Sequence, residues 1–403
     1  MPSLNRGRLI QQVNGINGVN AGGSATVNFP VNQRYHRITY QCVAVNYTGP
    51  NSANALFSGT ITAAAVVNIT GSGTGATVNL TVVNGAITAI DVNAAGSGYA
   101  VGDKFTIVDA TGQGFVGTVA TVSTGAMATA TVTSGGTPSP ISPVVFFGPQ
   151  GVQELVNGIN MRDIAPADII NTLSANGIPS DLGELPINYT EPFFNVNQQN
   201  EILSWDMFGQ STFTHKLTVA TGLVSPGLTG VMEFDFLRNV RPANGGNGQI
   251  PFLQPVAKHT YSFNLTASTN GNRINTLPFD FPIRRLWIQP ATAGTITGLI
   301  VYQDANKVFE VVSAAQMKQM YEPYGFQFGR ANYFNQTYAN TATNVLKTQF
   351  NAITYYDMAY LSDPDQRIFK ALSCDGSFVL VITSTAAQSV NVVMETLPGA
   401  YAA

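Results

Sequence analysis

Charged side chains are scarce in this sequence. Asp, Glu, Lys and Arg make up only 10% of its 403 residues, against roughly 25% in a typical soluble protein. Neutral polar residues and Gly replace them. Neutral polar groups lose less free energy than charges when a partner covers them and supplies hydrogen bonds. The composition favours a protein that packs against many copies of itself, and it also occurs in secreted β-proteins and adhesins.

The sequence lacks the marks of several other protein classes. Its formal net charge is −3, whereas a protein that grips nucleic acid shows a basic face or tail. Cys42 and Cys374 are the only cysteines, too few for a disulfide framework or a zinc site. There is no apolar run of the roughly 18 residues that span a bilayer. The opening MPSLNRGRLIQQ has no apolar segment of a secretory signal, so we expect synthesis in a cytoplasm.

Residues suited to catalysis or metal binding are few and scattered. The histidines are His36, His215 and His259, and their spacing is not that of a metal-binding pair, so we expect structural or surface roles. Asp363, Asp365 and Asp375 offer oxygen atoms of the kind that calcium prefers, but the EF-hand glycine and glutamate are missing. No nucleophile elbow or P-loop is present. The sequence predicts no catalytic residue, no cofactor, no metal and no enzymatic activity.

Short runs of β-branched and aromatic residues recur between Gly, Pro, Asn and Asp. Many short strands separated by turn residues predict a sandwich or barrel, and helix signals are few. We therefore expect a mainly-β protein. The expected strands are Ala25–Phe29, Val144–Phe147, Val152–Val156, Phe213–Val219, Val231–Leu237, Leu299–Tyr302, Ala352–Tyr356, Phe378–Thr383 and Val390–Glu395.

One order of elements occurs twice. Val152–Val156 follows the expected strand Val144–Phe147, and Val308–Val312 follows Leu299–Tyr302. Each pair leads into a helix candidate. The first candidate has Pro166 at its first position, Ile169, Ile170 and Leu173 on one face, and Gly177 at its end; the second has a Ser313–Gln316 capping box, then Met317, Met320 and Tyr321, with Gly325 past its end. Such a repeat predicts two copies of one β-domain.

Two further features match between the repeats. Phe29-Pro30 with Arg34 and Arg37 precedes the first unit, and Phe281-Pro282 with Arg284 and Arg285 precedes the second. Glu154 and Glu310 take equivalent places. We expect these glutamates to share a structural role at the end of a strand and not to form a catalytic pair.

Residues 59–140 differ from the rest of the chain. They contain four charged residues, Asp91, Asp103, Lys104 and Asp109, among abundant Gly, Ala, Thr and Val. Without this segment the two repeats have comparable lengths. Long insertions in loops cost little closure entropy. We therefore expect a first domain made of residues 1–58 and 141–262, a small β-domain inserted over 59–140, and a second domain over 263–403.

Aromatic residues gather in three segments, Phe193-Phe194, Trp205–Phe208 and Phe326–Tyr338. Such segments line sugar-binding surfaces, cores or subunit interfaces. Interfaces favour Tyr, Phe, Trp and Met, so we expect an interface.

The order of elements resembles a known family. Its segments follow one another as in the major capsid proteins of corticovirus-type, membrane-containing bacteriophages. These segments are Leu4-Asn5, Asn20–Pro30, Ile283–Ile288, Tyr321–Gly325 and the closing strand Val390–Glu395. The resemblance covers most of the chain outside residues 59–140. It lies in the order of patterns more than in identical residues.

That lineage includes tectivirus and adenovirus coat proteins, in which one chain carries two upright, eight-stranded jelly rolls. The resemblance implies a double jelly roll that forms pseudo-hexagonal homotrimers in the icosahedral shell of a virion. It implies contacts with neighbouring capsomers, penton and minor capsid proteins and an underlying lipid membrane, without specific nucleic acid binding. The insertion of residues 59–140 departs from a minimal double jelly roll, and we expect these residues to form a tower on the outer face.

Two other functions stay open. A tail fibre or receptor-binding protein shares the composition and the Gly-rich segment 59–140, and this function predicts fibrous repeats or a single terminal head. A jelly-roll carbohydrate-binding protein shares the β content. A carbohydrate-active enzyme needs two carboxylates in a cleft, and acidic residues here are scarce and unclustered.

Overall fold

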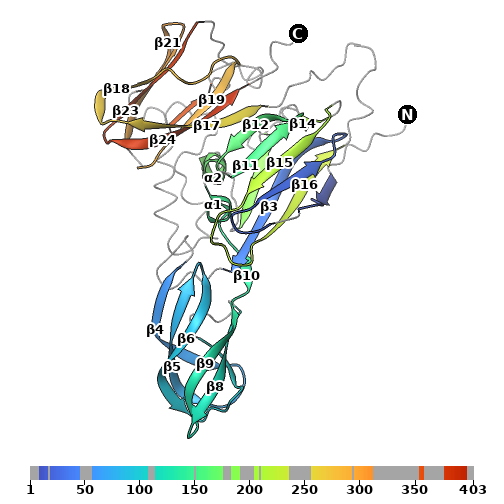
Figure 1. The fold of residues 1–403 in the computed structure, drawn as a ribbon. Helices are drawn as coiled ribbons and strands as arrows, with labels where there is room; N and C mark the ends of the chain where they lie inside the picture. Colours follow the sequence, from blue (N-terminus) through green and yellow to red (C-terminus); the bar gives the residue numbers. More distant parts are fainter. Residues whose placement is uncertain are drawn as a thin grey trace.

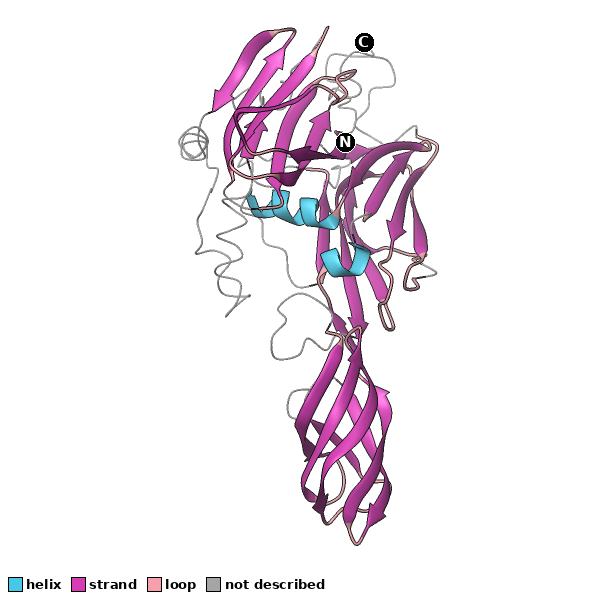
Figure 2. Cartoon of the chain, turned by 60° about the vertical axis from the view of Figure 1, so that its left-hand side comes forward, coloured by secondary structure: helices cyan, strands magenta, loops and turns pink. Residues whose placement is uncertain are grey.

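The computed structural model describes residues 9–16, 19–45, 57–107, 114–148, 151–175, 183–190, 204–207, 210–235, 256–292, 295–311, 354–357 and 376–396. Within these ranges the chain is mainly β, as predicted from the residue pattern. It forms two sandwiches and an elongated, separate sheet (Figures 1 and 2). No helix in the described ranges is long and apolar enough to cross a membrane.

The first sandwich has two sheets. One contains β1 (Leu9–Gln12), β16 (Gly227–Asp235), β3 (Arg34–Val45) and β13 (Glu184–Asn188), with β14 (Trp205–Asp206) and β10 (Pro138–Pro140) also paired to β3. The other contains β2 (Ser24–Phe29), β15 (Phe213–Thr218), β11 (Val152–Val156) and β12 (Ile159–Ile164). Strands such as β2 alternate exposed and buried residues, so one face of each sheet contributes to a shared core.

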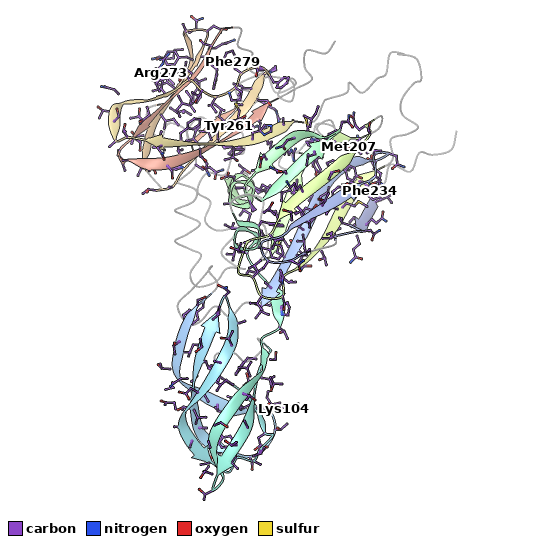
Figure 3. All side chains as sticks on the ribbon, viewed as in Figure 1. Lys104, Met207, Phe234, Tyr261, Arg273 and Phe279 are labelled. Carbon is purple, nitrogen blue, oxygen red and sulfur yellow. The ribbon has the colours of Figure 1, made fainter. Side chains whose placement is uncertain are left out.

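The second sandwich also has two sheets. One contains β17 (Ala257–Leu265), β24 (Gln388–Thr396), β19 (Ile283–Pro290) and β22 (Thr354–Asp357). The other contains β18 (Ser268–Ile274), β23 (Phe378–Ser384), β20 (Ile296–Gln303) and β21 (Asn306–Val311). Each sandwich has its own core, with Met207 and Phe234 in the first and Phe279 and Tyr261 beside the second (Figure 3).

The two sandwiches have the same strand order. Numbered along the chain, without the insert and the short β10 and β14, strands one, eight, three and six form one sheet of each sandwich. Strands two, seven, four and five form the other. This is the jelly-roll arrangement of paired Greek keys, so the chain is a double jelly roll, as predicted.

The hairpins made by the fourth and fifth strands match residue for residue. Their two-residue turns both have positive φ, at Asn157-Gly158 (53° and 78°) and at Asp304-Ala305 (48° and 70°). Each hairpin also has a bulge at the same distance from its turn, beside Glu154 in one and beside Val301 in the other. The β-domain predicted to occur twice is therefore confirmed.

The matching of the two repeats predicted from the sequence was nevertheless wrong by one strand. Val144–Phe147, expected as a strand, lies in the helix α1 (Pro143–Phe147). Proline is pre-organised for the first turn of a helix, and Phe146 and Phe147 are buried in the first core. Val152–Val156 therefore pairs with β12, and its counterpart is β20, not Val308–Val312.

The other expected strands are present where the structure describes them; Leu237 and Ala352, two of their predicted ends, lie outside the described residues. The first helix candidate is α2 (Pro166–Ala175). The second candidate, from Ser313 to Gly325, lies outside the described residues. The expected domain boundary at residues 262–263 falls inside β17, which pairs with β24 from Ala257 to Leu265. This strand as a whole belongs to the second sandwich.

The two matched turns give a stability prediction. Ala305 holds a left-handed conformation, φ 70°, that glycine adopts without cost and alanine does not. We expect Ala305→Gly to stabilise the protein by about 0.5 kcal/mol and Gly158→Ala to destabilise it by about 1 kcal/mol. Gly158 has open space around an added Cβ, so only backbone strain is tested. Thermal unfolding of both variants checks the prediction, and equal signs would contradict it.

The glycine-rich segment forms a sheet of its own. Its strands run in the order β6 (Ala86–Ser97), β5 (Thr74–Val83), β4 (Gly59–Asn68), β7 (Lys104–Ile107), β8 (Phe115–Ser123) and β9 (Ala126–Gly135). The sheet curls until β6 lies beside β9; a Cβ on Gly135 would approach the carbonyl oxygen of Ile87 to 2.6 Å. Its separate core includes Leu80, Phe105 and Phe115. It leaves after β3, returns through β10, and extends away from both sandwiches (Figures 1 and 2).

Candidate functional site at the junction of the two jelly rolls

The two sandwiches are joined by a short parallel strand pair. Arg162 of β12 lies beside Lys258 of β17, and Asp163 lies beside His259. This pairing merges one sheet from each sandwich into a continuous eight-stranded sheet. Charged side chains from both sandwiches gather at this junction: Glu154, Arg162, Lys258, Arg284, Arg285 and Glu395.

Arg162 ties the first sandwich to the start of the second. Its guanidinium donates hydrogen bonds to the carbonyl oxygens of Val256 at 3.3 Å and Asn188 at 3.2 Å. It also stacks on the rings of Trp205 and Tyr189, 4.5 and 4.9 Å from their centroids. Its Nη1 lies 3.7 Å from the buried Glu154 carboxylate. An arginine suits this place because its planar group can stack and hydrogen-bond together.

His215 lies between two tyrosines in the same core. The hydroxyl of Tyr40 is 2.7 Å from its Nδ1, and that of Tyr189 is 2.9 Å from its Nε2. Burial, reinforced by the Arg162 charge, lowers the pKa of His215 well below its usual value. Burial likewise raises the pKa of Glu154, against the opposing effect of Arg162. His215 is therefore a neutral, fully partnered core residue.

Glu395 is the anionic centre of the second half of the junction. Its carboxylate lies 2.6 Å from Lys258 Nζ, 3.5 Å from Arg284 and 3.6 Å from Arg285. Trp287 Nε1 donates to it at 3.4 Å. Burial alone would raise the pKa of Glu395, but Lys258, Arg285 and Arg284 outweigh burial and hold this pKa well below the usual range. The carboxylate therefore stays ionised and draws three cations together.

The first sandwich carries a counterpart of this acid. Arg34 lies opposite Asp235 in the β3–β16 pair, as Arg285 lies opposite Glu395 in the β19–β24 pair. Arg34 binds Asp235 through two hydrogen bonds, and His36 Nε2 lies 3.0 Å from the same carboxylate. Of the arginines matched between the sequence repeats, Arg34 and Arg285 therefore hold equivalent positions in the third strand of each sandwich, whereas the exposed Arg37 and the buried Arg284 do not.

This pair predicts an acid-dependent loss of stability. Burial would raise the pKa of Asp235, but hydrogen bonds from His36 and Arg34 lower it to about 2. A carboxyl with a depressed folded-state pKa stabilises the protein above its unfolded pKa, and the benefit fades as pH falls through the folded pKa. We expect roughly 2 kcal/mol of stability from this group at neutral pH to vanish between about pH 4 and pH 2. Urea unfolding of wild type and Asp235→Asn at pH 7, 4 and 2.5 checks this, and a difference independent of pH would contradict it.

The expectation that Glu154 and Glu310 share a structural role was wrong. Glu154 is buried in the first sandwich, whereas Glu310 is exposed and pairs with Lys307 at the surface. In the matched hairpins the counterpart of Glu154 is the buried Val301, and that of Glu310 is Asp163. The apparent equivalence arose from the misalignment by one strand.

The expectation that the aromatic segments form an interface was wrong for the residues that the structure describes. Trp205 and Met207 are buried in the first core, so they contribute neither a sugar surface nor an interface. Phe193-Phe194, Phe208 and Phe326–Tyr338 lie outside the described residues, as do Asp363, Asp365, Cys374 and Asp375. Cys42 is buried, and burial raises the pKa of its thiol.

Lys258 and Glu395 were not singled out in the sequence. Each is a single charge in a strand, and the available signal was that Glu395 ends an apolar run, Val392-Val393-Met394. His259 lies in β17 near the ring of Tyr261. Within the described ranges, no three His, Cys, Asp or Glu side chains are grouped to hold a metal ion. The printed ion pairs lie within each sandwich, and Arg162 joins the first sandwich to the start of the second through its hydrogen bond to the Val256 carbonyl.

Comparisons with known proteins point the same way as the strand order. No protein-family model and no curated protein matches the sequence. Among solved structures, the major capsid protein P2 from bacteriophage PM2 matches with a TM-score of 0.54 and 13% identity, over 96% of each chain. The STIV MCP matches with a TM-score of 0.51 and 9% identity, over 97% of each chain. The chain therefore has, over nearly its whole length, the double jelly-roll fold of these viral capsid proteins.

Proposed function

We propose that this chain is the major capsid protein of an icosahedral bacteriophage. The observation that carries the proposal is the tandem of two sandwiches with one strand order, fused through a continuous sheet. Two similar domains held at one angle let three chains present six similar units around an axis. Closed symmetric rings are the common outcome of such repeated contacts. The capsomer would be a homotrimer with a pseudo-hexagonal outline.

The low charge supports a role in self-assembly and not in catalysis. Neutral polar surfaces lose little when neighbouring copies cover them, and the buried carboxylates of Asp235 and Glu395 are already paired within the chain. We propose that the protein acts in the virion, is made in the host cytoplasm, and is not an enzyme. Its partners would be neighbouring capsomers, penton and minor capsid proteins and an underlying membrane, with no specific nucleic acid binding.

Residues 59–140 would form the outer tower of the capsomer. The sheet β4–β9 has its own core and joins the first sandwich through two chain crossings. We expect a variant that lacks residues 59–135 and keeps β10, joined by a short Gly-Ser linker, to assemble as the full chain does. Size-exclusion chromatography with light scattering checks this. Loss of assembly in a variant with a normal circular dichroism spectrum would contradict the tower.

The same method tests the proposed function on the full chain. A compact particle of three times 42.7 kDa, with a hexagonal outline by negative-stain microscopy, is the expected result. A monomer that never assembles would overturn the proposal and favour a carbohydrate-binding module. An elongated trimer would instead favour a tail fibre.

A further inference from the structure

The matched strand orders leave one contact incomplete. In the second sandwich, the first strand β17 has β24 on one side and β12 of the first sandwich on the other. Its counterpart β1 has β16 on one side and no described strand on the other. Likewise β12 lies between β11 and β17, whereas its counterpart β21 has a partner only in β20 among the described strands. Each chain thus contains one complete contact between the fifth strand of one sandwich and the first strand of the other, namely β12 with β17. It also contains the equivalent strands β21 and β1, which are not paired with each other.

The outer edges of β1 and β21 differ: β1 lacks the usual shields of an edge strand, whereas β21 carries Lys307 and Glu310. An edge strand is usually shielded by charge, proline or a bulge. β1 reads Leu-Ile-Gln-Gln, has no charge or proline, and pairs with β16 without a register shift. Ile10 is 73% exposed and Leu9 is 44% exposed, and on β21 the apolar Val308 is 39% exposed. Among the described strands neither β1 nor β21 has a partner on its outer side, and both strands expose apolar side chains.

We propose that β21 of one copy pairs with β1 of a second copy, in parallel, and so repeats between chains the β12–β17 contact within a chain. This inference rests on the proposed function, because it requires self-assembly. The partner is a second copy because only this chain supplies the matching half of a contact it already contains. The interface is heterologous, and such contacts form rings when the rotation closes. Three copies would satisfy all six fifth-to-first strand contacts.

The matched positions give the register. Asp163 lies beside His259 at the internal junction, and Glu310 is the counterpart of Asp163 in the hairpin. His259 pairs with Met394, the residue before Glu395, and Leu9 pairs with Phe234, the residue before Asp235. Since Asp235 is the counterpart of Glu395, Leu9 is the counterpart of His259. Glu310 of one copy is therefore expected beside Leu9 of the next. Adjacent strands lie roughly 5 Å apart, within the reach of a disulfide.

The test is a cross-link in the assembled full chain. Leu9→Cys and Glu310→Cys are introduced singly and together in a Cys374→Ser background, which leaves only the buried Cys42. Mild oxidation of the double variant should give covalent dimers and trimers on a non-reducing gel, and neither single variant should do so. An assembled double variant without cross-links would overturn the inference. Cross-linking by Leu9→Cys alone would also overturn it, because it indicates pairing of β1 with β1.

A charge on the edge provides a second measurement. We expect Ile10→Lys to raise the protein concentration needed for assembly at least tenfold, while Ile159→Lys leaves it unchanged. Ile159 is the matched control because it is 65% exposed but lies at the β11–β12 turn. Equal assembly of the two variants would overturn the inference. If wild type itself stays monomeric, the proposed function fails as well; if wild type assembles and the cross-link is absent, only this inference fails.

Discussion

Replacing Glu395 with glutamine is expected to lower the free energy of unfolding of the second sandwich by about 3 kcal/mol. The side chain is only 2% exposed and faces three cations. Glutamine keeps the shape but removes the charge, so the buried Arg284 and Arg285 and the partly exposed Lys258 lose their common counter-ion. Removing one partner from a buried ionic group typically costs 3–5 kcal/mol, because the remaining charge is left desolvated.

The measurement uses the tryptophans, since each sandwich has one, Trp205 in the first and Trp287 in the second. In a Trp205→Phe background, urea unfolding followed by fluorescence reports on the second sandwich. Glu310→Gln is the matched control, because Glu310 and Lys307 are each more than 40% exposed and solvent screens such surface pairs, so that they contribute little to stability. Equal effects of the two substitutions would show that the junction charges do not stabilise the fold.

The Glu395 effect should also persist in mild acid. Because the neighbouring cations depress the pKa of Glu395, its contribution is complete above the unfolded-state pKa and fades only as pH approaches the folded-state value. The difference between wild type and Glu395→Gln should therefore remain large near pH 4. A difference that disappears by pH 5 would contradict this assignment.

Arg162→Phe is expected to cost about 3–5 kcal/mol, and adding Glu154→Val should restore most of the loss. The single substitution leaves Glu154 buried without its cation, which is the expensive outcome for a buried pair. The double variant instead copies the second sandwich, where Val301 and Phe309 occupy the same hairpin positions and are buried. Replacing a whole buried pair with apolar residues is often neutral or stabilising.

A double-mutant cycle measures this coupling. Glu154→Val, Arg162→Phe and the double variant are unfolded in urea in a Trp287→Phe background, so that Trp205 reports on the first sandwich. We expect a coupling energy of at least about 2 kcal/mol. Additive effects would mean that Arg162 stabilises the protein through its contacts with Trp205 and the backbone, and not through Glu154.

The strands were predictable because their signals are local. Alternation of apolar and polar residues marked β15, and turn residues marked the ends of β23 and β24. The failure at Val144–Phe147 is informative, since a short run of Val and Phe fits a buried strand and a buried helical turn equally well. Burial of Phe146 and Phe147 in the first core, and Pro143 at the first helical position, favoured the helix α1. That one error shifted the repeat by a strand and misplaced Glu154.

By itself the sequence determined the β class, the presence of two related domains and the separate character of residues 59–140, because composition and periodicity act over a few residues at a time. Only the tertiary structure decided that β12 pairs with β17 and that Lys258, Arg284 and Arg285 converge on Glu395. These contacts join residues far apart along the chain, and no local propensity encodes which distant strands become neighbours. The burial of a charge depends on that choice, so the junction becomes visible only when both jelly rolls are folded.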